Sequence, residues 1–559
     1  MGQGQGFQPT PSNTDLAGQF FQLTQFGGMN TLVPRFALAD GEFSYLENLL
    51  PVVAATVNPT QGTAEYSSAL LAVPGQGPNL PGLPAGQTID RMWQKVVGPG
   101  QGQSPTNWLI VHTVQGNLYA YNLDKDMVTH GLSPSTPVQL NGSVQFSSPD
   151  CAVWQGMQLL VADPAAGYYS FTVTGLSNNL TWQPGVLLDG PGVLAPIISR
   201  IVVAFGRVWL LGNTQTPVVS APGSYTDFTA IDGAFDFVIA DEFVRKSITN
   251  MIVVGDYLYL IGDGATYVVG NVQANGAFQI TPVDQSHGTP FFGGAMNVGG
   301  ALVFAATDNI YAMQGLSPAN GIATKLSRFM QNLDFLTQPL IVSLSTIFSL
   351  QVLLVLAKYK DPVLGPRSIF LAVFNGLNCI LSNASNIVTT CTVEIIDPDD
   401  GKSQFRTYAS DGTNIFTVFN DDPDLFDYNG AAGPTYTAQT KLYDQGNPVF
   451  TKTVTQAGAF GFCRSPFGTL TTQVDTELSS ASTTQFLLPQ VNWTGLNGAP
   501  VKWTGLNGAP VVWYGEGIVF AQFQPGISGH YMGFTITGST PGFQLAALCA
   551  QYMVGGAWV

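Results

Sequence analysis

Charged side chains are scarce in this sequence. Asp, Glu, Lys and Arg together make up 10% of the 559 residues, whereas typical soluble domains carry about 25%. Charged groups keep soluble monomers apart, so this composition argues against an isolated monomer. We expect the chain to bury surface against sister copies, as large obligate interfaces do. The alternative is a chain that is merely rich in loops and in Ser, Thr and Gln.

Cations are the scarcer of the two charge types. The sequence has 19 Lys and Arg against 35 Asp and Glu, which gives a net charge of −16. A surface that binds duplex DNA needs Lys and Arg to neutralise phosphates, so the charge balance argues against this class of function. The acidity fits a conduit that DNA crosses without binding, although it is informative only if the chain forms a pore.

The residues that build metal sites, disulfide frameworks and common active sites are few and dispersed. None of the five cysteines forms a CxxC pair, and none of the four histidines lies within four residues of another. This spacing indicates neither a metal knuckle nor a disulfide framework, so we expect buried free thiols in a reducing cytoplasm. GxSxG, GxxxxGK[ST] and HExxH motifs are missing. The sequence therefore predicts no enzyme, no cofactor and no metal.

Two acidic clusters offer oxygen atoms that could bind Ca²⁺. They are Asp397-Pro-Asp399-Asp400-Gly401 and Asp421-Asp422-Pro-Asp424 with Asp427. Neither has the spacing of an EF-hand loop, and we interpret both as solvated turns, with Ca²⁺ binding left open.

Targeting and membrane signals are weak. Residues 1–6 lack the basic and apolar regions of a signal peptide. The segment Leu340–Ala357 has no charge over eighteen residues, which is near the lower limit for a membrane helix. Its β-branched and Ser/Thr content favours buried strands over that alternative.

Glycine, proline and aromatic residues are abundant, with 63 Gly, 36 Pro, 35 Phe and 19 Tyr. Gly and Pro break helices, and aromatic residues favour strands, so we expect an all-β protein. A unit recurs from about residue 105: two apolar runs around a Gly-centred turn, which predicts a hairpin. The turns lie at 115–117, 155–156, 206–207, 255–256 and 299–300, and a less regular sixth unit spans Leu350–Phe374.

The hairpins are spaced roughly 40 to 50 residues apart, which is the period of a four-stranded propeller blade. We therefore predict a β-propeller-like central domain, the alternative being ordinary hairpins in sandwiches. We place the domain boundaries where the pattern of apolar runs and turns changes. They give an extended N-terminal arm at 1–50, the propeller-like domain at 51–384, and a C-terminal β-sandwich or barrel at 385–559.

A tandem repeat lies inside the C-terminal domain. Trp493-Thr-Gly-Leu-Asn-Gly-Ala-Pro-Val501 is followed, after Lys502, by the same nine residues from Trp503 to Val511. The Asn-Gly pairs predict turns. Exposed Trp residues often anchor partners, so Trp493, Trp503 and Trp513 are the candidate partner-contact residues. A core or decorative role is the alternative.

The two ends of the chain resemble a known family. The N-terminal motifs are Phe26-Gly-Gly-Met-Asn30-Thr31, Ala37-Leu-Ala-Asp40-Gly41-Glu42 and Leu46-Glu-Asn48-Leu-Leu-Pro51, and the C-terminal stretches are 528–539, 541–545 and 551–556. Together they resemble the opening and closing segments of the nozzle, or tail-stabilisation, proteins of short-tailed bacteriophages. The Trp repeat is not part of that pattern.

The resemblance implies a structural virion protein without catalytic residues to transfer. In that family a β-propeller with added β-domains forms a hexameric tube below the portal and adaptor, and the N-terminal arm threads into the assembly. The expected partners are sister copies in a homohexamer, the tail adaptor, tail fibres or spikes, and a host surface, with viral DNA passing transiently. The expected location is the virion tail, after synthesis in the host cytoplasm.

Two other classes of function stay open. A host-binding or glycan-degrading tail protein could use propeller loops and Trp-rich turns to hold sugars, and it would need paired carboxylates at one pocket. A cell-surface propeller unrelated to phage is the third hypothesis, which the missing signal peptide disfavours.

Overall fold

The computed structural model describes most of the chain. It covers residues 18–53, 56–59, 83–97, 106–123, 137–172, 180–182, 198–212, 217–237, 239, 248–273, 277–332, 343–347, 352–361, 365–374, 377–381, 387–396, 403–418, 435–463, 469–486, 503–504, 510–511, 517–538 and 543–557. Strands dominate these ranges, and the helical segments are short: η1 (Arg35–Ala37), η2 (Ala230–Asp232), η3 (Thr324–Leu326) and α2 (Ser327–Asn332). The predicted all-β class is confirmed.

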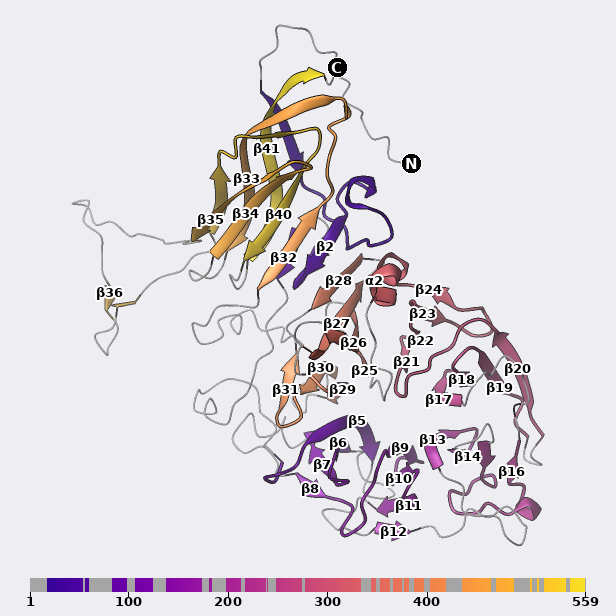
Figure 1. Cartoon of the computed structure of the whole chain (residues 1–559). Helices are drawn as coiled ribbons and strands as arrows, with labels where there is room; N and C mark the ends of the chain where they lie inside the picture. The colour runs from indigo at the N-terminus through magenta and orange to yellow at the C-terminus, as the bar shows by residue number, and fades with distance from the viewer. Residues whose placement is uncertain are drawn as a thin grey trace.

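Five four-stranded antiparallel sheets follow one another along the chain (Figure 1). The first two contain β5 (Ile89–Val97), β6 (Thr106–Thr113), β7 (Leu118–Asn122) and β8 (Val138–Gln139), then β9 (Asp150–Trp154), β10 (Gln158–Asp163), β11 (Gly167–Thr172) and β12 (Leu180–Trp182). The third and fourth contain β13 (Ile198–Ala204), β14 (Arg207–Gly212), β15 (Pro217–Val219) and β16 (Phe235–Asp236), then β17 (Ile248–Val254), β18 (Tyr257–Gly262), β19 (Thr266–Gly270) and β20 (Gln279–Asp284). The fifth contains β21 (Ala295–Val298), β22 (Ala301–Ala305), β23 (Ile310–Met313) and β24 (Asn320–Gly321).

The predicted Gly turns join the first two strands of several sheets. Between β9 and β10, Gln155 and Gly156 have φ values of 48° and 69°, and between β21 and β22, Gly299 and Gly300 have 57° and 83°. Two successive positive φ angles are what a two-residue hairpin turn requires, because this turn matches the right-handed twist of its strands.

Each sheet is buried on both faces, which explains the continuous apolar runs in the sequence. Alternate side chains of a strand point to opposite faces. In β6, Leu109 and Val111 lie in one apolar cluster, while Trp108 and Ile110 lie in another, shared with the second sheet. Further shared clusters join the second sheet to the third, the third to the fourth and the fourth to the fifth.

Two more sheets complete a ring of seven. The sixth blade consists of β25 (Ser343–Ile347), β26 (Val352–Asp361), β27 (Gly365–Phe374) and β28 (Leu377–Leu381), and the seventh of β29 (Thr389–Ile396), β30 (Ser403–Ser410) and β31 (Ile415–Val418). Val393, Tyr408 and Ile415 of the seventh blade pack with Leu109 and Val111 of the first. The described part of the chain therefore forms a closed, seven-bladed β-propeller.

The positions of these blades differ from two predicted boundaries. The boundary predicted at residue 384 falls inside the ring, because β29–β31 follow it and pack between β25 and β5. The described part of the predicted 1–50 arm contributes strands to the sheets of its own chain, as detailed below.

The uncharged segment Leu340–Ala357 contributes β25 and the first part of β26. Its described residues are therefore strands, as the sequence favoured. No helix among the described residues is long and apolar enough to cross a membrane.

The sixth blade continues into a second domain. β28 pairs with β2 (Phe43–Glu47), and the sheet runs on through β32 (Tyr436–Thr440), β40 (Met532–Gly538), β34 (Thr469–Thr476) and β35 (Ser480–Phe486). The result is one nine-stranded sheet in the order β25-β26-β27-β28-β2-β32-β40-β34-β35. Figure 1 shows this sheet passing from the propeller into the upper domain.

A second sheet packs on this extension. It contains β1 (Gln19–Leu23), β3 (Leu49–Val53), β4 (Thr56–Pro59), β33 (Phe450–Cys463), β38 (Gly517–Phe523), β39 (Ile527–Gly529) and β41 (Phe543–Ala557). Val454 and Ala459 of this sheet share a core with Leu470, Phe534 and Ile536 of the nine-stranded sheet. Of the two predicted alternatives, the described strands form a sandwich, since their pairings do not close a barrel.

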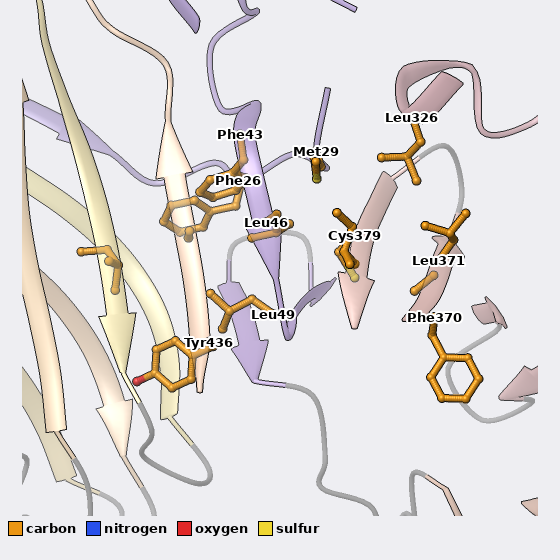
Figure 2. Close-up of a cluster of buried hydrophobic side chains, with 14 of the residues drawn as sticks. Phe26, Met29, Phe43, Leu46, Leu49, Leu326, Phe370, Leu371, Cys379 and Tyr436 are labelled. Atoms are coloured by element: carbon orange, nitrogen blue, oxygen red, sulfur yellow. The ribbon is translucent and has the colours of Figure 1, made fainter. Parts of the chain in front are cut away.

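The link between the two domains is β2, inserted between β28 and β32. β2 pairs in parallel with β28 at Glu47 and Ile380, and antiparallel with β32. The amide of Asn48 donates to the carbonyl of Ile380 at 2.8 Å, and that of Met29 donates to the carbonyl of Asn378 at 2.7 Å. Figure 2 shows Phe43 and Leu46 on β2 between Cys379 on the propeller side and Tyr436 on the sandwich side.

Polar contacts from the same N-terminal segment hold both domains. Toward the propeller, the amide of Thr31 donates to the carbonyl of Lys325 at 2.8 Å, and the Lys325 ammonium lies 2.9 Å from a Glu42 carboxylate oxygen. Toward the sandwich, Arg35 Nη2 lies 2.7 Å from Asp475 Oδ2. Gly41 lies in the tight turn between these contacts. Its φ is 84°, and a Cβ at this position would lie only 2.6 Å from the Gln25 carbonyl oxygen, so the turn requires glycine.

We expect Leu46→Ala to destabilise both domains together. Leu46 is fully buried in the core that the two domains share, and deleting such a side chain costs about 2–5 kcal/mol. Calorimetry should show one unfolding transition that moves to lower temperature. Leu316→Ala is the matched control, because Leu316 is 56% exposed and its loss should cost less than about 0.5 kcal/mol. Two separate transitions, of which one is unmoved, would contradict the shared core.

Candidate functional site

The innermost strands of all seven blades surround one cavity of about 620 Å³ at the centre of the propeller. Residues of β5, β9, β13, β17, β21, β25 and β29 line it. Its volume falls in the range of small-molecule sites, about 300–1,000 Å³. This cavity is the candidate functional site.

Three of the inner strands carry a register shift at the same place. Pairing shifts between Ile89 and Arg91 in β5, between Ile198 and Arg200 in β13, and between Ile248 and Asn250 in β17. A bulge of this kind leaves one residue unpaired and redirects the side chains next to it. In each strand a polar residue, Arg91, Arg200 or Asn250, follows the shift and lines the cavity.

These polar residues bond to the neighbouring blades. Arg91 Nη1 donates to the Pro149 carbonyl at 3.3 Å, and Arg200 Nε donates to the Thr249 carbonyl at 3.0 Å. Asn250 Nδ2 donates to the Phe291 carbonyl at 2.8 Å. Each contact crosses from one blade to the next, so the cavity wall is fixed by side-chain bonds as well as by apolar packing.

Cations outnumber carboxylates in the lining. Arg91, Lys95 and Arg200 face the cavity with one carboxylate, Asp150. The amides of Cys151 and Ile201 donate to the two Asp150 oxygens at 2.9 and 3.1 Å. No ion pair joins Asp150 to any of the three cations in the described structure. The cavity thus carries an excess of two positive charges in a chain whose net charge is −16.

Arg200 is the most deeply buried of the three cations, with 6% of its surface exposed. Its guanidinium lies 4.0 Å from the centre of the Phe292 ring. Burial lowers the pKa of Arg200 to about 10, with Asp150 opposing this shift and Arg91 reinforcing it. Arg200 therefore remains a cation at neutral pH.

Two cysteine thiols also line the cavity, Cys151 and Cys391. Burial raises the pKa of Cys151 to about 12, although Lys95 and Arg91 act in the opposite direction. Burial likewise raises the pKa of Cys391 to about 12. Both thiols are free, as the sequence predicted.

The predicted partner-contact residues, Trp493, Trp503 and Trp513, are not among the residues that line this cavity. Trp503 begins the short strand β36 (Trp503–Thr504), which pairs with β37 (Pro510–Val511). Figure 1 draws this hairpin away from both sandwich sheets. Trp493 and Trp513 lie outside the described residues, as do both acidic clusters, 397–401 and 421–427. Of these residues the structure therefore places Trp503 alone.

The described histidines each pair with one carboxylate. His112 Nδ1 lies 2.6 Å from Asp90, His287 Nδ1 lies 2.9 Å from Asp284, and His530 Nδ1 lies 2.7 Å from Glu477. Within the described ranges, no group of three or more His, Cys, Asp or Glu residues is placed to hold a metal ion.

The cavity residues themselves were missed by sequence reasoning. A usable signal was present, because the chain has only 19 Lys and Arg and two of them, Arg91 and Lys95, stand four residues apart in one strand-like segment. Residues at this spacing lie on the same face of a strand.

No family model and no curated protein matches this chain. Among solved structures, it is similar to BBS1N in complex with ARL6DN, with 9% identity over 63% of this chain and 96% of that chain and a TM-score of 0.37. It is also similar to the N-terminal domain of Nup159, with 10% identity over 65% of this chain and 95% of that chain and a TM-score of 0.34.

We expect the thiols of Cys151 and Cys391 to resist alkylation by iodoacetamide in the native protein. With a pKa of about 12, roughly one molecule in ten thousand carries the reactive thiolate at pH 8. Peptide mass spectrometry should find both sites unlabelled when the guanidinium-unfolded chain, the control, is fully labelled. Labelling of native Cys151 at the unfolded rate would contradict the buried geometry of the cavity wall.

Proposed function

We propose that this chain is a structural virion protein, the nozzle subunit of a short bacteriophage tail, and that it has no enzymatic activity. In this proposal, sister copies form a hexameric tube below the portal and adaptor, and the tube closes and extends the channel for DNA ejection. Its other partners are the tail adaptor, tail fibres or spikes, and a host surface. Its place is the tail of the virion, after synthesis in the host cytoplasm.

The observation that carries the proposal is the free edge of the nine-stranded sheet. β35 is the last strand of that sheet and, among the described strands, pairs only with β34. Its sequence, Ser-Ala-Ser-Thr-Thr-Gln-Phe, contains no charge and no proline. Proteins usually protect a free edge with charges, proline or a bulge, because its unpaired backbone groups recruit other strands. An unprotected edge is suited to pairing with a sister copy.

The continuous sheet gives such a contact a rigid base. β35 belongs to the same sheet as β25, the inner strand of the sixth blade. A contact made at β35 is therefore transmitted to the propeller through backbone hydrogen bonds. This is a suitable construction for the wall of a tube, and the net charge of −16 would let DNA pass without adhering, since like charges repel.

The terminal motifs add support from sequence. Gly41, Glu42 and Asn48 belong to the stretches that resemble the nozzle family, and these residues make the return and the contacts that join the two domains.

Glycan degradation receives less support from the geometry. Most glycosidases place two carboxyl groups about the scissile bond, and the described cavity lining has one, Asp150.

We expect the purified chain to form rings that sedimentation velocity and negative-stain microscopy detect. The double variant Ser480→Lys/Ser482→Lys should remain folded and monomeric, because both side chains are exposed and charges on an edge strand block pairing.

Thr226→Lys, at an exposed loop position of the third blade, is the matched control and should assemble like the wild type. A wild-type chain that stays monomeric at high concentration, or a double variant that still forms rings, would contradict the proposal.

A further inference from the structure

We propose that the central cavity of the propeller binds a small anion of the phosphate class, with two or more negative charges. This inference is independent of the proposed tail function, since it rests on the wall of the cavity within a single chain.

The first observation is the distribution of charge. The cavity lining holds three of the 19 cations of the chain but only one of its 35 carboxylates. Acidic residues outnumber basic ones nearly two to one in the sequence, so the reversed ratio in the lining sets the cavity apart. A concave site lined by one sign of charge concentrates ligands of the opposite sign.

The second observation is that none of the three cations forms an ion pair with a carboxylate of the described residues. The Lys95 ammonium makes no hydrogen bond or ion pair with any described residue. Arg200 uses Nε and Nη1 on the carbonyls of Thr249 and Ser199, and its Nη2 has no bond to a described residue. Asp150 is the one lining carboxylate that acts on the buried Arg200, so three cations share a single counter-charge, and an uncompensated charge away from water is costly. An anion in the cavity would remove that cost.

The third observation is that the wall is fixed before a ligand arrives. Backbone bonds hold the Arg200 guanidinium, and the Phe292 ring lies 4.0 Å from it. Arg91 is anchored on the Pro149 carbonyl. Guanidinium groups held in one orientation match the oxygens of a phosphate group, and little further entropy is lost when the ligand binds.

The geometry also fits the size of such a ligand. Arg91 and Lys95 lie on the same face of β5, with Cα atoms about 13 Å apart at the rise of a strand. Arg91 and Arg200 belong to inner strands at either side of β9, which carries Asp150. A compact polyanion is therefore favoured over a single carboxylate. A DNA duplex is too wide for a cavity of about 620 Å³.

The test is calorimetric titration of the full-length chain with inorganic pyrophosphate at low salt. We expect one site per chain, with binding weakened by added salt. Lys95→Gln should lower the affinity at least about tenfold, because a hydrogen bond to a charged group is lost. Its fold should be unchanged, since the Lys95 ammonium makes no hydrogen bond or ion pair with a described residue. Arg91→Gln is a second variant with the same expected loss of affinity; because Arg91 also bonds to the Pro149 carbonyl, its fold is checked by circular dichroism before the titration.

Arg328→Gln is the matched control, because Arg328 is exposed on α2 and lies outside the cavity. It should bind pyrophosphate within about twofold of the wild type, since surface charges away from a site contribute little. The proposal is overturned if the wild type binds no pyrophosphate, or if Lys95→Gln and Arg91→Gln bind as tightly as the wild type. It is also overturned if a short DNA duplex displaces pyrophosphate, because the cations would then serve an open nucleic-acid surface.

Discussion

The insertion of one short strand, β2, between β28 of the propeller and β32 of the sandwich is the constraint on which the rest of the molecule depends. Without β2, the sixth blade would end in a free edge at β28, and β32 would keep β40 as its one neighbour among the described strands. Backbone bonds from Met29 and Asn48 satisfy carbonyls of the propeller strand. The apolar side chains of Phe43 and Leu46 are fully buried in the shared core. The two domains therefore form one continuous β structure.

The local part of this fold was predictable from the sequence. Runs of apolar residues around Gln155-Gly156 and Gly299-Gly300 specify hairpins, because the backbone of these turns needs positive φ. Their regular spacing indicated blades. The inner strand β5 was missed for a physical reason. Its sequence, Ile-Asp-Arg-Met-Trp-Gln-Lys-Val-Val, is interrupted by the polar residues that face the cavity, so it does not read as an apolar run.

The long-range part of the fold was not predictable. Glu47 and Ile380 pair across more than 300 residues, and no local pattern specifies such a partner. The seventh blade was assigned to the C-terminal domain because its first strand, Cys391–Ile396, alternates like a sandwich strand; only its packing against Leu109 and Val111 places it in the ring. The cavity depends on the same closure, since Arg91, Arg200 and Asn250 meet only when the blades form a circle.

Three of the 19 cations of this chain, Arg200, Arg207 and Lys452, are buried in the described structure. Arg207 is 1% exposed and donates to the carbonyls of Ser220 and Gly233. Lys452 is 2% exposed, and its ammonium donates to the carbonyls of Phe450 and His530. These buried cations fasten backbone carbonyls instead of forming surface ion pairs. Arg91 and Arg200 serve both as fasteners between blades and as the charge of the cavity.

Native-state hydrogen exchange tests the central claim, the continuity of the two domains, most directly. If β2 joins them, the amides of Leu46, Asn48 and Met29 should exchange as slowly as those of the central strands of the propeller and the sandwich, because exposing them requires global unfolding. Exchange at these amides as fast as at the free edge strand β35 would show that the domains separate locally, and it would contradict the account.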